Sequence, residues 1–142
     1  MIRRKGREIA LHLLYQWEIN RNSIDKIIED YKKYFEIPNE KAFEFAVELV
    51  KGITSHLKDI DNIIKKNTPS WPFERQNTTD RNILRIAVYE MFFRPDIPEI
   101  VSINEAIELA KIYGTDDSPA FVNGVLDSIY KKELCKKKNE KK

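Results

Sequence analysis

The spacing of apolar residues is the feature that most narrows the folds open to this chain. Apolar residues recur at intervals of three and four along its length, and no stretch alternates convincingly between polar and apolar. Intervals of three and four place apolar side chains on one face of an α-helix, whereas alternation would indicate a strand. Since the 142 residues include only four Gly and six Pro, the pattern predicts an all-α single domain of about seven helices joined by short links.

Turn and cap residues divide the first half of this pattern. Helices are expected at about 3–19 and 23–35, with Ser23 as the cap of the second. A long third pattern begins near Glu40 and ends before Pro69, and Gly52 is expected to kink or divide it.

The second half contains an element that is apolar almost all round. This helix is expected to be capped by Thr78 or Thr79 and to end at Phe93, and its composition predicts a central position in the bundle. Ser102 and Glu105 form a capping-box pattern that opens the next helix. Gly114 is expected to close that helix, and Asp117 or Ser118, before Pro119, to open the last one.

Charge is distributed unevenly along the chain. Residues 1–7 carry +4 and residues 131–142 carry +5, so a net charge of +2 leaves −7 on the body between them. This asymmetry indicates a polyanion as a partner of the ends and a basic protein as a partner of the body. The simpler reading of residues 131–142 is a solubilising tail, and we expect a domain at 1–132 followed by a disordered Lys-rich tail at 133–142.

The N-terminal stretch RRKGREIALHLLYQW joins this positive charge to a helix. A helical wheel predicts that an outward row is formed by Arg4, Arg7, Leu11 and Tyr15. A stripe that faces the core is formed by Ala10, Leu13 and Trp17. Guanidinium groups bind phosphates and a Tyr ring stacks on an unpaired base, so this row of side chains indicates single-stranded RNA as the ligand. A solvated helix start and a DNA-binding helix are the alternatives, the latter less favoured because no helix-turn-helix pattern accompanies it.

Acidic residues on the body suggest a second surface. Asp80, Glu90, Glu105 and Glu108 are mixed with Arg81, Arg85 and Lys111, and the acidic excess could hold a basic protein or simply be solvated. Asn104 and Asn123 are expected to tie helix ends or loops together by hydrogen bonds.

Several classes of protein are not expected. No glycine-rich phosphate loop or nucleophile motif is present, and His12 and His56 read as surface residues, so neither an enzyme nor a cofactor site is expected. Two His and the single Cys135 give no metal-ligand spacing. A lone Cys indicates a reducing compartment. The sequence contains no run of about 18 apolar residues, so a membrane span is not expected. We therefore expect a cytoplasmic protein.

Three blocks of sequence resemble the NusB family of bacterial transcription antitermination factors. They are RRKGREIALHLLYQWE at 3–18, DRNILRIAVYEMFFRPDIPEIVSINEAIELAKIYG at 80–114 and DDSPAFVNGVLD at 116–127. The resemblance implies two three-helix bundles packed across each other. It also implies binding of boxA single-stranded RNA in nascent ribosomal RNA operon transcripts, together with NusE, a small-subunit ribosomal protein, and joining of the elongating RNA polymerase complex through other Nus factors.

The resemblance also assigns residues by position. The RNA side would comprise Arg3, Arg4, Lys5, Arg7, His12, Tyr15, Asp117 and Phe121. His12 stands where relatives often carry Gln. The side facing NusE would comprise Glu74, Asp80, Glu105 and Glu108.

Two other readings stay open on sequence grounds. The acidic body would suit a helical adaptor that binds proteins alone. The same helical domain is similar to an N-terminal module of certain RNA cytosine methyltransferases, so a detached or regulatory module of that kind is the third hypothesis.

Overall fold

The structure, a computed structural model, describes residues 2–37 and 39–135 of the chain. These residues form seven α-helices and no β-strand, which confirms the predicted all-α class. The helices are α1 (Ile2–Asn20), α2 (Ile24–Tyr34), α3 (Glu40–Ser55), α4 (Leu57–Lys66), α5 (Thr78–Phe93), α6 (Glu99–Tyr113) and α7 (Ser118–Ile129). Two short turns accompany them, η1 (Phe73–Arg75) and the π-helical η2 (Tyr130–Cys135).

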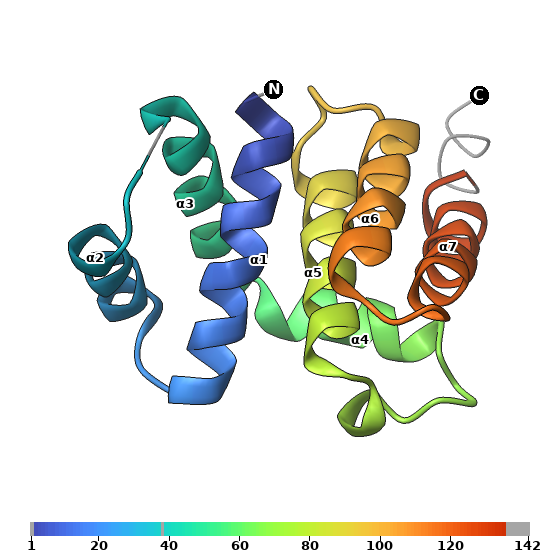
Figure 1. The fold of residues 1–142 in the computed structure, drawn as a ribbon. Helices are drawn as coiled ribbons and strands as arrows, with labels where there is room; N and C mark the ends of the chain where they lie inside the picture. The colour runs from blue at the N-terminus through green and yellow to red at the C-terminus, as the bar shows by residue number, and fades with distance from the viewer. Residues whose placement is uncertain (1, 38, 136–142) are drawn as a thin grey trace.

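The helices form two groups that share α5. Helices α1, α2 and α3 contact one another, and α5, α6 and α7 form the second group, with α4 packed against α5 and α7 (Figure 1). Helix α5 also contacts α1 and α3, so it joins the two groups. This arrangement confirms the expected pair of three-helix bundles.

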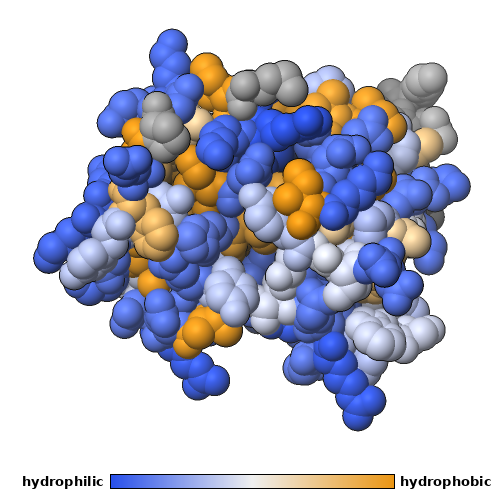
Figure 2. All heavy atoms as spheres, in the orientation of Figure 1, coloured by the Kyte–Doolittle hydropathy of each residue, from blue (hydrophilic) through white to orange (hydrophobic). Residues whose placement is uncertain are grey.

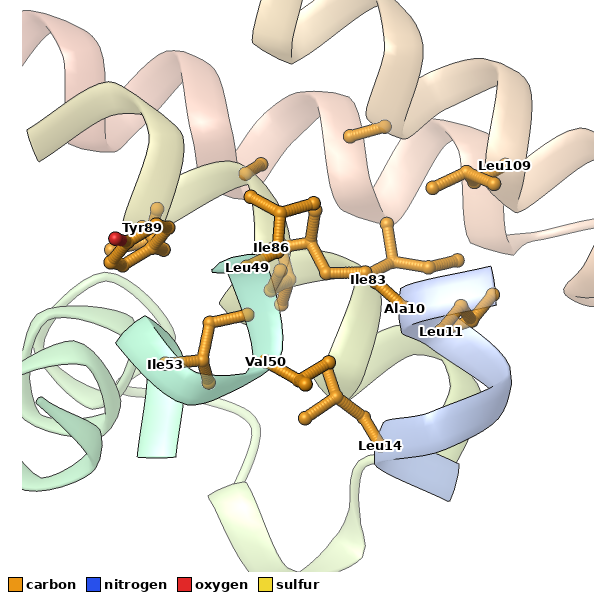
Figure 3. Packing of buried hydrophobic residues seen from close by; sticks show 14 of the residues in the cluster. Ala10, Leu11, Leu14, Leu49, Val50, Ile53, Ile83, Ile86, Tyr89 and Leu109 are labelled. Carbon is orange, nitrogen blue, oxygen red and sulfur yellow. The ribbon is translucent and has the colours of Figure 1, made fainter. Parts of the chain in front are cut away.

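The central position predicted for α5 is confirmed. Every residue from Asn82 to Met91 is buried. Figure 3 shows Ile83, Ile86 and Tyr89 of α5 meeting side chains of α1 and α3, namely Ala10, Leu11, Leu14, Leu49, Val50 and Ile53. Because burial of each large apolar side chain contributes about 1.5–3 kcal/mol, this shared core holds the two groups together.

Two predicted helix ends are confirmed. The Ser23 hydroxyl oxygen accepts a hydrogen bond from the Lys26 N–H at 3.2 Å and so caps α2. Helix α6 ends at Gly114, whose N–H donates to the Ala110 carbonyl at 2.9 Å.

The long third pattern is divided, but not at the predicted glycine. The break between α3 and α4 lies at His56 (φ −117°, ψ 23°), whereas Gly52 lies inside α3. A Cβ atom at Gly52 would overlap the Tyr89 ring. Gly52 therefore lets α5 approach α3 closely, and the division expected at Gly52 is wrong.

Two predicted helix starts are also corrected, and a third is as predicted. Asn77, rather than Thr78 or Thr79, caps α5 by accepting the Asp80 N–H at 2.7 Å. Helix α6 begins at Glu99 directly after Pro98, so Ser102 lies inside the helix and forms no capping box. The start of α7 is as predicted, but its N-cap Asp117 makes no side-chain cap bond.

The C-terminal end of the fold extends past the predicted domain boundary. The turn η2 continues to Cys135, three residues into the segment expected to be a tail, and residues 136–142 lie outside the described residues. Within the described ranges, no helix combines the length and hydrophobicity needed to span a bilayer.

Candidate RNA-binding surface

Helix α1 buries a wider face than the wheel predicts. The predicted core residues Ala10 and Leu13 are fully buried, and Trp17 is partly buried against the core. Leu11, expected on the outward row, is also buried, because α1 contacts α3 on one side and α5 on the other.

The expected exposure of Arg7 is wrong. Its side chain is 4% exposed, and its Nε and Nη2 donate to the two carboxylate oxygens of Glu90 at 2.7 Å each. The Ser102 hydroxyl donates to the same carboxylate at 2.8 Å. Glu90, which the sequence placed on a mixed surface, is therefore the buried centre of a network that ties α1 to α5 and α6.

Arg4 and Arg3 remain half exposed, but each is paired with an acid. Arg4 donates through Nε and Nη2 to both carboxylate oxygens of Glu105, at 3.1 and 2.7 Å. The hydrogen bond from Arg4 lowers the pKa of Glu105. Arg3 donates to Asp96 at 2.9 Å. Arg4, expected on the RNA side, thus pairs with Glu105, expected on the protein side.

Apart from Arg3, Arg4 and the two ends of the helix, one stripe of α1 residues is open or partly open to solvent. Lys5, Glu8, His12 and Tyr15 follow one another at helical intervals, and all four line a groove of about 600 Å³. Tyr15 is 47% exposed, and Lys5 forms no ion pair within the part of the chain that the structure describes. Figure 2 shows this face as largely hydrophilic with separate hydrophobic patches.

The other walls of the groove come from distant segments that the sequence did not single out. They are Tyr31 and Glu36 on the α2 side, Thr79 at the start of α5 and Tyr113 at the end of α6. The Tyr113 hydroxyl donates to Glu8 at 2.8 Å, and burial together with this bond raises the pKa of Tyr113 to about 12. No sequence pattern signals this meeting, because it depends on how the two bundles pack.

His12 lies against aromatic rings at the groove. Its ring meets Tyr31 and Phe35 edge-on, with centroid distances of 5.4 and 5.2 Å. Burial lowers the pKa of His12, so its ring is neutral at pH 7. A neutral imidazole presents one donor and one acceptor, which suits a base edge better than a phosphate.

A second hollow, of about 310 Å³, brings together residues that the resemblance had assigned to different partners. Asp117 and Phe121, from the expected RNA side, share it with Asp80, from the expected protein side. Trp71 and Arg75 complete much of its wall. Asp80 is buried and directly follows Thr79 of the groove, so the groove and this hollow both reach the start of α5.

The remaining acids expected to face a protein do not line this hollow. Glu105 and Glu108 line a shallow depression on α6 with Arg4 and Arg7. Glu108 also pairs with Lys111 at 3.3 Å. Glu74 is exposed in η1.

The expected surface positions of Arg81 and Arg85 are corrected as well. Arg85 is buried and donates to both carboxylate oxygens of Asp61, at 2.8 and 2.9 Å, and to Glu18. Arg81 donates to both oxygens of the same Glu18, at 3.1 and 2.6 Å. These bonds join α1, α4 and α5 and have a structural role. Within the described ranges, no group of three or more His, Cys, Asp or Glu could hold a metal ion.

Comparison with known proteins finds similarity over nearly the whole chain. A model described as the NusB family matches residues 4–131. The transcription antitermination protein NusB of Thermodesulfovibrio yellowstonii is 42% identical over 151 aligned positions, which cover 100% of both chains. The protein of the same name from Geobacter sp. (strain M21) is 47% identical over 134 positions, covering 89% of this chain and 92% of the relative.

Solved structures agree with this similarity. The structure of T. maritima NusB matches with a TM-score of 0.84 and 40% identity, over 99% of this chain and 98% of that one. A crystal structure of the antitermination factors NusB and NusE in complex with dsRNA matches with a TM-score of 0.82 and 30% identity, over 92% and 96%.

Proposed function

Because this chain belongs to the NusB family of transcription antitermination proteins, we propose that it binds boxA RNA in nascent ribosomal RNA operon transcripts together with NusE. Through other Nus factors, this assembly joins the elongating RNA polymerase complex in the cytoplasm. The observation that carries the proposal is the groove, in which the open stripe of α1 meets Tyr113. The complex of the structural relative with NusE and dsRNA supports the choice of partners.

On the RNA side, the groove supplies three kinds of contact. Lys5 offers an ammonium group that no acid neutralises within the described residues, so it contacts a phosphate. Tyr15 stacks on an unpaired base, and His12 donates to or accepts from a base edge. Arg3 and Arg4 do not line the groove and would reach a phosphate by exchanging their exposed partners Asp96 and Glu105.

The remaining RNA-side residues act from the second hollow or through the fold. Phe121 offers a second aromatic surface and Asp117 an acceptor for a base N–H group. Arg7 is too buried to reach a phosphate. We assign it a positioning role, since its bond to Glu90 holds the start of α1 in place.

On the protein side, NusE contacts the acidic body of the chain. Glu74 and Glu108 are the acids that we assign to this surface, since Asp80 is buried, and the −7 charge of residues 8–130 suits a basic ribosomal protein. Glu105 contributes less, because Arg4 already neutralises it. This function is recognition and scaffolding, and no catalytic step is proposed.

Fluorescence anisotropy with labelled boxA RNA, with and without NusE, tests the proposal. We expect Lys5→Glu and Tyr15→Ala to weaken binding about tenfold or more, since a stacked base alone is worth about 1–3 kcal/mol. Lys58→Glu makes the same charge change on α4 and should bind like wild type. Each lost phosphate contact should also reduce the slope of log K against log salt by about 0.7.

Two results would overturn this function. One is equal affinity of wild type for boxA RNA and a scrambled RNA of the same length. The other is equal loss of affinity in Lys5→Glu and Lys58→Glu, which would mean that net charge, and not the groove, controls binding.

A further inference from the structure

An aromatic column runs from the core to the surface at the end of α2. The rings of Phe43 and Tyr31 lie 5.9 Å apart at 15°, and those of Tyr31 and Phe35 lie 4.7 Å apart at 17°. Phe43 and Tyr31 are buried, whereas Phe35 is 43% exposed. The column therefore ends at the surface in a ring whose plane continues the stack.

The surroundings of Phe35 hold this ring in place and leave part of it open. One face lies on Tyr31, and His12 meets it edge-on at 79°. Its backbone N–H donates to the Tyr31 carbonyl at 3.0 Å, which fixes the end of α2. Within the described residues no further ring stacks on Phe35.

The column adjoins the groove on α1. His12 and Tyr31, which both contact Phe35, are lining residues of the groove, and so is Glu36, the next residue along the chain. Helix α2 lies beside α1 in Figure 1. A strand of RNA that leaves the groove over His12 meets the open part of Phe35 next.

Positive charge and a further aromatic ring accompany the column. Lys32 and Lys33 are exposed, and neither forms an ion pair in the described part of the chain. The Lys33 ammonium lies 5.6 Å from the ring centre of Tyr34, which is 72% exposed. Unpaired lysines beside open aromatic rings are the combination that binds single-stranded nucleic acid without strict sequence preference.

We propose that the end of α2 is a second RNA contact, in which Phe35 stacks on an unpaired base flanking boxA while Lys32 and Lys33 contact its phosphates. The inference rests on the proposed function and extends it to nucleotides outside the groove. A protein partner is disfavoured, because the open feature is one stacked ring accompanied by Tyr34 and two lysines and not a contiguous apolar patch.

The test compares two RNAs, one of boxA length and one carrying several unpaired nucleotides at each end. We expect wild type to bind the longer RNA more tightly. Phe35→Leu, which keeps an apolar side chain but removes the flat ring, should bind the longer RNA about tenfold more weakly and the shorter RNA as wild type does. Phe35→Tyr should restore the affinity, and Ile100→Ala, which trims an exposed apolar residue of α6, should change neither value.

A fluorescent base gives a second readout that altered folding alone would not mimic. With 2-aminopurine placed in turn at each flanking position, stacking should quench one position in wild type and Phe35→Tyr, and Phe35→Leu should lose that quenching. Melting temperatures of the variants show whether each is folded.

The possible failures are distinguishable. If wild type binds neither RNA, the proposed function and this inference both fail. If wild type binds both but Phe35→Leu matches it on the longer RNA, this inference fails and the proposed function stands. If Phe35→Leu weakens NusE binding in the absence of RNA, the end of α2 is a protein contact and the inference is wrong.

Discussion

At the scale of single residues, burial decides what each N-terminal arginine does. The Arg3 and Arg4 side chains are 49% and 43% exposed, and that of Arg7 is 4% exposed, although the three lie within one and a half turns of α1. An exposed ion pair contributes little because water screens it, whereas a buried guanidinium that loses its partner is left as an uncompensated charge. The first two arginines can therefore exchange partners with a ligand, and the third holds the fold.

Arg7→Met alone, or Glu90→Leu alone, is expected to destabilise the protein by about 3–5 kcal/mol. The first leaves the Glu90 carboxylate buried without its ion-pair partner, and the second leaves Arg7 only its longer contact with Glu105, at 3.4 Å. The double variant should recover most of this loss, since two apolar side chains then replace the pair. Urea unfolding followed by circular dichroism measures the three values. Arg3→Ala, which breaks an exposed pair, is the control and should not change stability measurably. A double variant as unstable as the sum of its parts would contradict the pairing.

The pKa of His12 gives a second prediction at this scale. Burial lowers it below the ordinary value of 6.5, so folding favours the neutral ring. This stabilisation is present above pH 6.5 and declines as the pH falls through the lower folded value. Titration of the ring protons by NMR measures the pKa directly, and His56→Gln identifies the signal, since the chain has two histidines. A pKa above 6.5 in the free protein would contradict the partial burial of the ring. Bound RNA should raise the value if a phosphate lies near the ring.

Sequence patterns identified some residues of the groove, but they did not predict how deeply each side chain is buried. Tyr15 could be identified from the helical wheel, whereas Lys5 and His12 were assigned through the family resemblance. Arg7 could not be separated from them, because a helical wheel shows direction but not how many neighbours cover a face. Tyr113 and Phe35 carry no local signal at all, since their positions depend on the packing of other helices.

At the scale of helices, glycines serve different purposes that spacing alone does not reveal. Gly52 and Gly124 both lie inside helices. A Cβ atom at Gly52 would overlap Tyr89, which itself stacks on Phe93 at 5.3 Å, whereas nothing lies within 4 Å of a Cβ atom at Gly124. The first glycine is needed for packing and the second is not.

Alanine at these two positions should therefore have opposite effects. Gly52→Ala should cost about 1–3 kcal/mol, because the Tyr89 ring must leave its stack despite the better helix propensity of Ala. Gly124→Ala should add about 0.5–1 kcal/mol, since the propensity gain meets no clash. Thermal unfolding of the two variants measures both changes, and the same sign in both would contradict the packing role of Gly52.

The start of α5 offers a direct test of capping. Asn77→Ala should destabilise the protein by about 1 kcal/mol, since it removes the acceptor for the Asp80 N–H. Thr78→Ala, at the position predicted from the sequence, should have a smaller effect because Thr78 makes no cap bond. The number of helices could be predicted from apolar spacing. The cap could not, because Asn77, Thr78 and Thr79 are all suitable cap residues and tertiary packing determines which of them is used.

At the scale of the whole molecule, the two bundles share one core and should unfold together. Helix α5 contacts α1 and α3 as well as α6 and α7, and the bonds of Arg85 to Glu18 and Asp61 join α1, α4 and α5. Neither group of helices can bury its apolar face without α5. A domain of this size with one core is expected to unfold in a single transition.

A cavity created by substitution in the second bundle, far from the first, tests whether the two bundles unfold together. Trp71→Phe leaves Trp17 of α1 as the one tryptophan, and its fluorescence then reports on the first bundle while circular dichroism reports on all helices. Leu126→Ala, at a fully buried position of α7 in the second bundle, should cost about 2–5 kcal/mol. If the molecule is one unit, this change lowers the urea midpoint of the Trp17 signal as much as that of circular dichroism. If the bundles unfold separately, the Trp17 midpoint stays where it was, because α7 lies outside the group formed by α1, α2 and α3.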